Sequence, residues 1–197
     1  NNGVTSSDGT PVVSLSNAST ENGGTIQIHD NPACSSAQGI TRTITAGSTN
    51  HNDITYAVDG SADGPKAFYA VATDTYGNVS NCADVSLSYV LDTTAAVVAI
   101  TAAADITSAN QNSYSVSGTC SENGEIVSIS VGGIDPGLIN CIGNAWSVNN
   151  LNVSGLAEGN VVITADHADA AGNDAPQASV TVTKDTTAPT IAEIQAW

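Results

Sequence analysis

The sequence contains no methionine and few aromatic residues, with one phenylalanine, two tryptophans and five tyrosines among 197 residues. Serine, threonine, asparagine, glycine and valine are abundant instead, and this composition favours strands and turns over helices. The chain has no apolar run of roughly 18 residues, the length that spans a bilayer as a helix. No charged n-region is followed by an apolar segment either. The sequence therefore predicts an all-β chain with neither a transmembrane helix nor a signal peptide in this stretch.

Positive charge is also scarce. Three lysines and arginines stand against 19 aspartates and glutamates, and the formal net charge is −16 at pH 7. Nucleic acid is excluded as a partner because no basic cluster is available to displace counterions from phosphate. Insertion into an anionic membrane is disfavoured for the same reason. An acidic, oxygen-rich surface attracts hard divalent cations such as calcium.

A two-part pattern occurs twice in the chain. The segment VLDTTAAV at residues 90–97 returns as TKDTTAPT at residues 183–190. Each copy follows a turn-like segment, DTYGN at residues 74–78 and DAAGN at residues 169–173. The period of about 95 residues predicts two modules, each large enough for a small core of its own.

The repeat sets the predicted domain boundaries. Residues 1–10 show no periodicity and are expected to form a flexible leader. The first module is predicted over residues 11–93 and the second over residues 94–187. Residues 188–197 are expected to be a linker and the start of a following module, which indicates a longer tandem array.

Within each module, apolar residues alternate with polar ones in short runs that are separated by Gly, Asn and Asp. This pattern predicts half-buried antiparallel strands that are joined by turns. The predicted strands are 11–16, 25–30, 40–45, 53–58, 66–74 and 84–91 in the first module, and 97–102, 113–119, 125–131, 145–153, 160–167 and 178–183 in the second. The predicted fold class is all-β, with two tandem Ig-like (Greek-key) β-sandwiches arranged end to end.

Alignment of the two DxxGN segments predicts which residues of the preceding strand face the core. The aligned positions are Phe68, Ala70 and Ala72 in the first module and Ile163, Ala165 and His167 in the second. Trp146 is predicted to fill the second core with its indole nitrogen bonded to a carbonyl group. The alternative for Trp146 is an exposed binding platform.

Two cysteines fall in each module, Cys34 with Cys82 and Cys120 with Cys141. Four cysteines allow three pairings, and independent folding of each repeat favours the two bridges within modules. No CxxC spacing supports a zinc site. Disulfides indicate an oxidising, extracytoplasmic location. Four free thiols in a cytosolic protein are the alternative.

The sequence carries no recognisable catalytic set. His29, His51 and His167 are far apart, and neither a GxSxG turn nor an HExxH helix is present. A non-enzyme is therefore predicted. Isopeptide cross-linking would need a buried lysine beside Asn or Asp, whereas Lys66 and Lys184 are expected at strand ends or junctions.

The module ends contain the residues most suited to bind a metal ion. Asp74 and Asn78 are expected in a turn where Gly77 supplies the positive φ, and Asp92 is expected at the same end of the module. Close carboxylates repel, and a bound Ca²⁺ reverses this effect. Alternatively, DxxGN is a turn that is capped by its own aspartate, and DTTAP is a stiff linker. The second module repeats the set as Asp169, Asn173 and Asp185, with Asp166 as an additional ligand.

These motifs resemble a known family. ATDTYGNVS with LDTTA, and HADAAGNDA with KDTTAP, are similar to the bacterial Ig-like modules that repeat in very large surface adhesins and other exported proteins. The resemblance spans residues 11–189 and implies the fold, the tandem setting, an extender role and calcium at the module junctions. Two features depart from the family. Ala96 replaces the linker proline, which is expected to loosen the first linker, and the cysteine pairs are not typical of calcium-rich adhesin repeats.

The leading functional hypothesis is a non-enzymatic spacer of a bacterial surface or secreted fibre, whose partners are neighbouring modules of the same chain. A second hypothesis is a terminal module that binds a glycan or a host or prey surface protein through loops 46–52 or 132–140. A third is an accessory module of a secreted hydrolase. All three place the chain outside the cell or on the bacterial surface.

Overall fold

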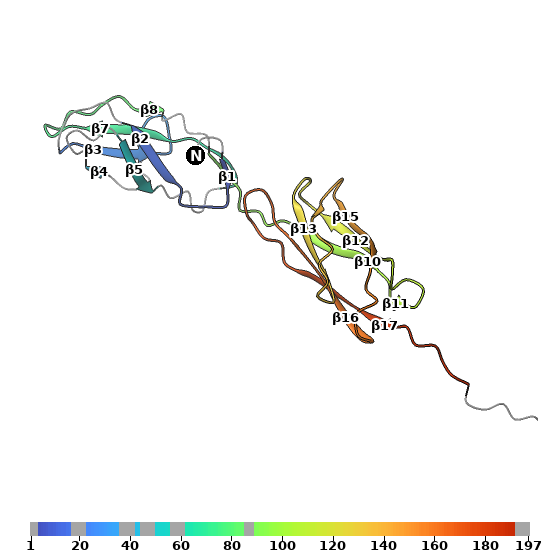
Figure 1. The fold of residues 1–197 in the computed structure, drawn as a ribbon. Coiled ribbons are helices and arrows are strands. Elements are labelled where there is room, and N and C mark those ends of the chain that lie inside the picture. Colours follow the sequence, from blue (N-terminus) through green and yellow to red (C-terminus); the bar gives the residue numbers. More distant parts are fainter. Residues whose placement is uncertain are drawn as a thin grey trace, which may run out of the picture. The chain divides into compact units, whose positions relative to one another are not determined.

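The computed structural model describes residues 4–16, 23–35, 42–43, 50–55, 62–84 and 89–191. The chain divides into two compact units, residues 1–94 and residues 95–197. Every regular element in the described ranges is a β-strand (Figure 1). The all-β prediction is confirmed, since each unit has the sheets of a β-sandwich.

The second unit consists of a three-stranded and a five-stranded sheet (Figure 1). The smaller sheet has the order β10 (Val98–Ala103), β12 (Tyr114–Cys120) and β15 (Ala145–Leu151). The larger sheet has the order β11 (Ile106–Thr107), β17 (Ala178–Asp185), β16 (Gly159–His167), β13 (Ile126–Val131) and β14 (Ile139–Asn140). The strands of the two sheets alternate between buried and exposed residues, as expected for two layers around one core.

Trp146 lies in the core of the second unit. Its side chain is 3% exposed and belongs to the buried cluster that both sheets contribute. Its indole Nε1 donates a hydrogen bond to the carbonyl oxygen of Ala99 at 3.2 Å. The predicted role as a core anchor is confirmed. Gly118 on β12 is paired with Trp146 on β15 and leaves the space that the indole ring occupies.

The first unit contains strands β1 to β9. Their bounds are β1 (Val4–Ser6), β2 (Val12–Ser16), β3 (Thr25–His29), β4 (Arg42–Thr43), β5 (Asn50–Thr55), β6 (Gly64–Lys66), β7 (Tyr69–Thr73), β8 (Ala83–Asp84) and β9 (Tyr89–Leu91). They form sheets of the order β1-β9-β6, β4-β3-β7-β8 and β2-β5. The chain runs from β6 into β7, and β8 comes before β9 in the chain. Taken together, the sheets β1-β9-β6 and β4-β3-β7-β8 therefore have the same strand neighbours as the five-stranded sheet of the second unit.

Two short parallel strands have no counterpart in the sequence prediction. β1 pairs with β9 and β11 pairs with β17, in each case beside the last strand of the unit. β1 lies inside the segment that was expected to be a flexible leader, so residues 4–6 belong to the fold of the first unit. The physical reason is that three or fewer residues in a parallel pair cannot display an alternating pattern.

The predicted core face of the penultimate strand is mostly buried. Phe68, Ile163, Ala165 and His167 are buried, whereas Ala70 and Ala72 are half-buried. Phe68 packs edge-on against Tyr89, with ring centroids 6.2 Å apart. The alignment through the DxxGN segments therefore places equivalent residues on equivalent strands.

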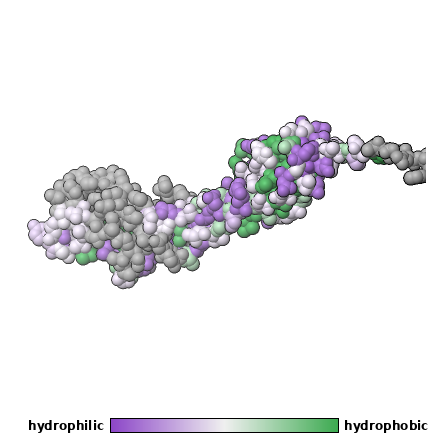
Figure 2. Space-filling view, turned by 90° about the horizontal axis from the view of Figure 1, so that it is seen from below, coloured by the Kyte–Doolittle hydropathy of each residue, from purple (hydrophilic) through white to green (hydrophobic). Residues whose placement is uncertain are grey.

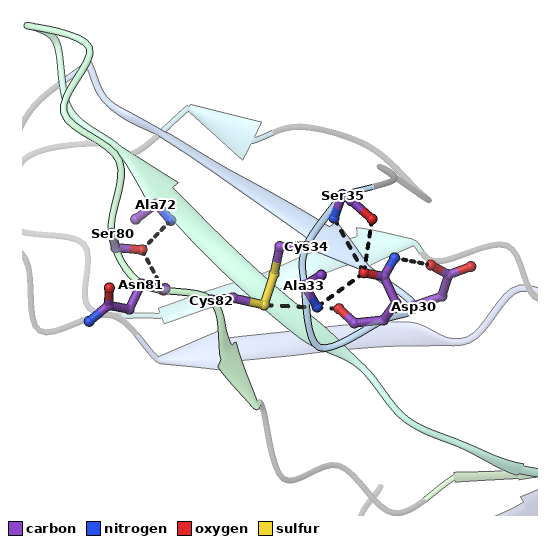
Figure 3. The surroundings of a disulfide bond; sticks show 9 residues. Asp30, Ala33, Cys34, Ser35, Ala72, Ser80, Asn81 and Cys82 are labelled. Atoms are coloured by element: carbon purple, nitrogen blue, oxygen red, sulfur yellow. Dashed lines mark hydrogen bonds between the residues drawn. A yellow bond between two sulfur atoms is a disulfide. The ribbon is translucent and has the colours of Figure 1, made fainter.

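Each disulfide joins two cysteines of the same unit, as independent folding of the two repeats favoured. Cys34 pairs with Cys82, and Cys120 pairs with Cys141. Figure 3 shows the first bridge, which connects the loop after β3 to the segment before β8. In that loop the side-chain oxygen of Asn31 accepts the N–H of Ala33 at 3.1 Å (Figure 3). The second bridge connects the end of β12 to the residue after β14 and so links the two sheets.

Candidate functional site

The first DxxGN segment forms a turn that its own aspartate closes. Oδ1 of Asp74 accepts the backbone N–H groups of Tyr76 and Asn78 at 2.9 and 2.8 Å. Oδ2 of Asp74 accepts the side-chain amide of Asn78 at 2.6 Å. Gly77 has a φ of 88°, which favours glycine. This geometry matches the self-capped turn that was the alternative to a calcium ligand set.

The second DxxGN turn has the same bonds. Oδ1 and Oδ2 of Asp169 accept the backbone and side-chain N–H groups of Asn173, each at 2.8 Å. The carbonyl oxygen of Asn173 also accepts the N–H of Ala96 at 3.4 Å. The turn therefore holds the segment that leads into β10. A proline at position 96 would lack this N–H, so Ala96 makes an attachment that the expected linker proline could not make.

These bonds stabilise the ionised carboxylates. The side chain and backbone of Asn78 lower the pKa of Asp74 below its ordinary value of 3.8. Burial is the largest single influence on Asp169 and opposes its ionisation. The bonds from Asn173 and the neighbouring backbone outweigh it, so the pKa of Asp169 also lies below 3.8.

Acid is expected to destabilise the second unit through Asp169. A carboxyl with a lower pKa in the folded protein stabilises the fold above its unfolded value, and this contribution is lost as the pH falls through the folded value. The thermal midpoint should therefore fall as the pH is lowered below about 3.8. In Asp169→Asn this fall should be shallower between about pH 5 and pH 2. Calorimetry over this range tests the expectation, with Asp174→Asn, an exposed site near the same turn, as the control. Equal slopes in Asp169→Asn and the wild type would contradict it.

The last strand of the first unit ends beside an acid that the sequence prediction missed. Oδ1 of Asp63 accepts the backbone N–H of Thr93 at 2.9 Å and its hydroxyl at 2.8 Å. Oδ2 of Asp63 accepts the hydroxyl of Thr94 at 2.7 Å. Asp92 accepts the N–H of Thr94 at 3.1 Å through its own Oδ1. The DTT segment is thus bound to the loop that precedes β6.

The second unit ends in the same way. Glu158 accepts the backbone N–H of Thr186 at 2.9 Å through Oε2, and its Oε1 accepts the hydroxyl of the same threonine. Oδ1 of Asp185 accepts the N–H of Thr187 at 3.0 Å. One signal could have found both acids. Asp63-Gly64 and Glu158-Gly159 each stand 11 residues before the aspartate of a DxxGN turn.

The structure does not bring Asp92 to Asp74 and Asn78. β9 runs antiparallel to β6, and Leu91 pairs with Gly64, so Asp92 lies near the start of the strand that leads to Asp74. Ten or so extended residues between Gly64 and Asp74 span about 30 Å. The physical reason is that the last strand runs back, antiparallel to the strand before the turn. It therefore ends at the end of the unit opposite to the DxxGN turn.

The same separation holds in the second unit. Gly159 pairs with Lys184 and Ala165 pairs with Ala178, so Asp185 lies at the opposite end of the hairpin from Asp169 and Asn173. Figure 1 shows the β16–β17 connection at the end of the unit opposite to the point at which the chain leaves it. The fourth proposed ligand, Asp166, accepts the side-chain amide of Gln177 at 2.9 and 3.0 Å.

The described residues do not fit the predicted calcium set. No group of three or more His, Cys, Asp or Glu side chains is arranged to hold a metal ion within the described ranges. Both oxygens of Asp74 and both of Asp169 accept protein N–H groups. Calcium at the module junctions stays a prediction, but Asp74, Asn78 and Asp92 do not form a common site.

The buried histidine of the second unit has structural partners. Nδ1 of His167 lies 2.9 Å from the carbonyl oxygen of Ile126, and its Nε2 lies 3.3 Å from the backbone nitrogen of Glu122. These partners define the neutral tautomer with the proton on Nδ1. His29 is also buried, and the side chain of His51 lies outside the described residues. The contacts of His167 hold β13 and the β12–β13 connection in place.

A groove of about 670 Å³ lies on the second unit against β12 and β15. Leu138 and Ile142 border it and are 82% and 74% exposed, and Figure 2 shows hydrophobic residues among polar ones on the surface of this unit. Leu138 belongs to the predicted binding loop 132–140, so this loop forms part of a concave surface. In the other predicted loop, 46–52, residues 46–49 lie outside the described residues. Nowhere in the described part of the chain is there a helix that could cross a membrane.

No family model matches the chain, and no curated protein matches it. Among solved structures, the chain is similar to the fibronectin(III)-like modules of Clostridium thermocellum CbhA, with a TM-score of 0.52, 16% identity and coverage of 99% of this chain and 96% of that one. It is also similar to a Ca²⁺-stabilized adhesin that helps an Antarctic bacterium bind ice, with a TM-score of 0.51 and 23% identity. That match covers 92% of this chain and 45% of the adhesin chain. At these identities the likeness establishes the fold, which is the β-sandwich of fibronectin III-like and adhesin modules.

Proposed function

We propose that the chain is a pair of non-enzymatic extender modules from a bacterial surface adhesin or secreted fibre. The observation that carries this proposal is the repetition of one architecture with one ending. Both units repeat the strand neighbours of the larger sheet, and both end in a DTT segment bound to an acid. Serial repetition of a module with a fixed exit is the arrangement that an extended rod requires.

The setting outside the cell has independent support. Each unit carries one disulfide, and disulfides persist in oxidising compartments. The similar solved modules come from an adhesin and from CbhA of Clostridium thermocellum. The partners of an extender are the neighbouring modules of its own chain. Calcium at the junctions is the finer part of the hypothesis, and it requires ligands other than the combined set of Asp74, Asn78 and Asp92.

The rival function is recognition of a glycan or a surface protein by the second unit. The groove beside Leu138 and Ile142 favours it, since two exposed apolar side chains border a concave surface of ligand size. Hydroxyl-bearing residues line the groove, namely Thr101, Ser117, Thr119 and Ser147. Its one aromatic residue, Trp146, is buried, so the groove lacks the exposed aromatic ring on which sugars commonly stack.

Glycan-array binding tests the extender proposal against recognition of a glycan. For an extender we expect no glycan to bind the 197-residue chain above the level of the array background. Reproducible binding that is lost in Leu138→Ser would overturn the extender proposal and establish the groove as a site. Val162→Ser is the matched control, because Val162 is 49% exposed on β16 and does not line the groove. Binding that Val162→Ser abolishes equally would show a general surface effect and would leave the groove unsupported.

A further inference from the structure

The end of each unit combines three features that the sequence places far apart. An acid followed by glycine precedes the penultimate strand, and the glycines Gly64 and Gly159 have φ values of 123° and 108°. The last strand runs back antiparallel and ends opposite that glycine. The threonines of the DTT segment then donate to the acid. We call this set the exit clasp, and it comprises Asp63 with Thr93 and Thr94 in the first unit and Glu158 with Thr186 in the second.

The two clasps reach the same result with acids of different length. Asp63 uses one oxygen for Thr93 and the other for Thr94. Glu158, which is one methylene longer, uses both oxygens for Thr186. In each unit the acid accepts the backbone N–H and the hydroxyl of one threonine, Thr93 or Thr186. The peptide plane and the side chain of that threonine are therefore both fixed.

Among the described residues, the clasp lies where the last strand ends and the chain leaves the unit. Beyond Thr187, residues 188–191 are exposed and belong to no strand. In the first unit, the N–H of Asp92 donates to the carbonyl oxygen of Ser6 at 3.0 Å, and the following residues are held by Asp63. Hydrogen bonds to an ionised carboxylate are stronger than neutral ones. The threonine bonds lower the pKa of Asp63 and of Glu158, so both acids are ionised at neutral pH.

We propose that the exit clasp, and not a calcium ion held by the DxxGN turns, fixes the direction in which the chain leaves each unit. This inference rests on the extender function and names the part of the module that would make an extender stiff. Of the carboxylates that the sequence predicts as calcium ligands, those of Asp74 and Asp169 accept N–H groups of their own turns. The acids that contact the exit segment accept from threonine instead. The clasp therefore supplies from within the chain the constraint that a junction ion would supply.

Amide exchange and relaxation of the ¹⁵N-labelled full chain test the proposal. In Asp63→Ala the exchange rate of the Thr93 amide should rise by roughly tenfold to a hundredfold, the factor expected for one hydrogen bond to a charged group. The order parameters of Thr93 and Thr94 should fall from about 0.85, typical of rigid backbone, toward 0.6 or below. Thr94→Val replaces the hydroxyl by a methyl group and should mobilise the backbone at position 94 less than Asp63→Ala does. It also keeps the proposal testable if Asp63→Ala does not fold.

Asp135→Asn is the control, because Asp135 is an exposed aspartate of the second unit that accepts the N–H of Gly137 at 2.7 Å and makes no bond to Thr93 or Thr94. It should leave Thr93 and Thr94 unchanged. Each variant is measured in calcium and in EDTA, and the wild type should give the same order parameters in both. Unchanged order parameters at positions 93 and 94 in both Asp63→Ala and Thr94→Val would overturn the proposal. The proposal would also be overturned if EDTA lowered the order parameters of Thr93 and Thr94 in the wild type as much as Asp63→Ala does. Neither result bears on glycan binding, so failure of the clasp is distinct from failure of the extender function.

Discussion

In the Gly118→Ala variant, the second unit is expected to unfold at a much lower denaturant concentration than in the wild type. A Cβ atom at this position would lie 1.8 Å from the carbonyl oxygen of Ala99 and 2.6 Å from two atoms of the Trp146 ring. The oxygen belongs to a paired strand, and the ring is bonded to that same oxygen, so neither neighbour has room to move. Overpacking of a well-packed core costs about 1 to 3 kcal/mol of folding stability. Because this clash involves the backbone, Gly118→Ala should lower the free energy of unfolding by about 3 kcal/mol or more.

The measurement is urea unfolding followed by the fluorescence of Trp146. The chain has two tryptophans, and Trp197→Phe in every variant leaves Trp146 as the single reporter on the second unit. Gly155→Ala is the matched control, because a Cβ at Gly155 meets no atom within 4 Å. It should unfold like the wild type. A Gly118→Ala variant with an unchanged midpoint would show that β10 and β15 can separate, and it would contradict the packing described for Trp146.

Lys184→Met is expected to destabilise the second unit by about 2 to 4 kcal/mol. Lys184 is 3% exposed, and its Nζ donates to the carbonyl oxygens of Ser154 and Leu156 at 2.8 and 2.5 Å, with that of Val153 at 3.4 Å. Methionine retains much of the apolar stem but offers no donor to these carbonyl groups. The loop that connects β15 to β16 would lose its main attachment to β17.

Lys66→Met is the matched control, since Lys66 is half-buried and donates to the single carbonyl oxygen of Ala62 in the first unit. It should leave the unfolding of the second unit unchanged. The comparison uses the same urea titration and the same tryptophan reporter. If Lys184→Met had the same unfolding midpoint as the wild type, the three carbonyl groups would have to find other donors. The Lys184 side chain would then not stabilise the loop that connects β15 to β16.

Much of the fold follows from local pattern. The alternation in residues 145–153 and 160–167 predicts strands that the structure places within two residues at each end, as β15 and β16. A period of two puts every second side chain on one face, so the same pattern also predicts that Ile163 and Ala165 are buried. Trp146 could be assigned to the core because a large aromatic residue on such a face has few other places to pack.

The candidate site was harder to predict. The turns at Asp74 and Asp169 are local, and the sequence predicted them as turns, with self-capping as the alternative to a calcium site. The partners of the DTT segments are not local, because Asp63 and Glu158 lie about 30 residues upstream of the threonines that they bind. Their shared position before a glycine becomes meaningful only when the pairing of the last strand is known. Lys184 also looked like a strand-end lysine, and only the packed loop around it shows that it is buried.

The sequence by itself determined the all-β class, the two repeats and the strands with clear alternation, and it favoured the pairing of cysteines within modules. These features depend on short-range periodicity and on the repetition of motifs, both of which can be read along one chain. Only the tertiary structure decided which acids meet which partners at the ends of the units. An antiparallel last strand carries Asp92 and Asp185 away from the DxxGN turns and toward Asp63 and Glu158. The direction and register of strand pairing thus separate the acids that the sequence pattern had placed in one site. They also bring the DTT segments to Asp63 and Glu158, which the pattern had not connected with them.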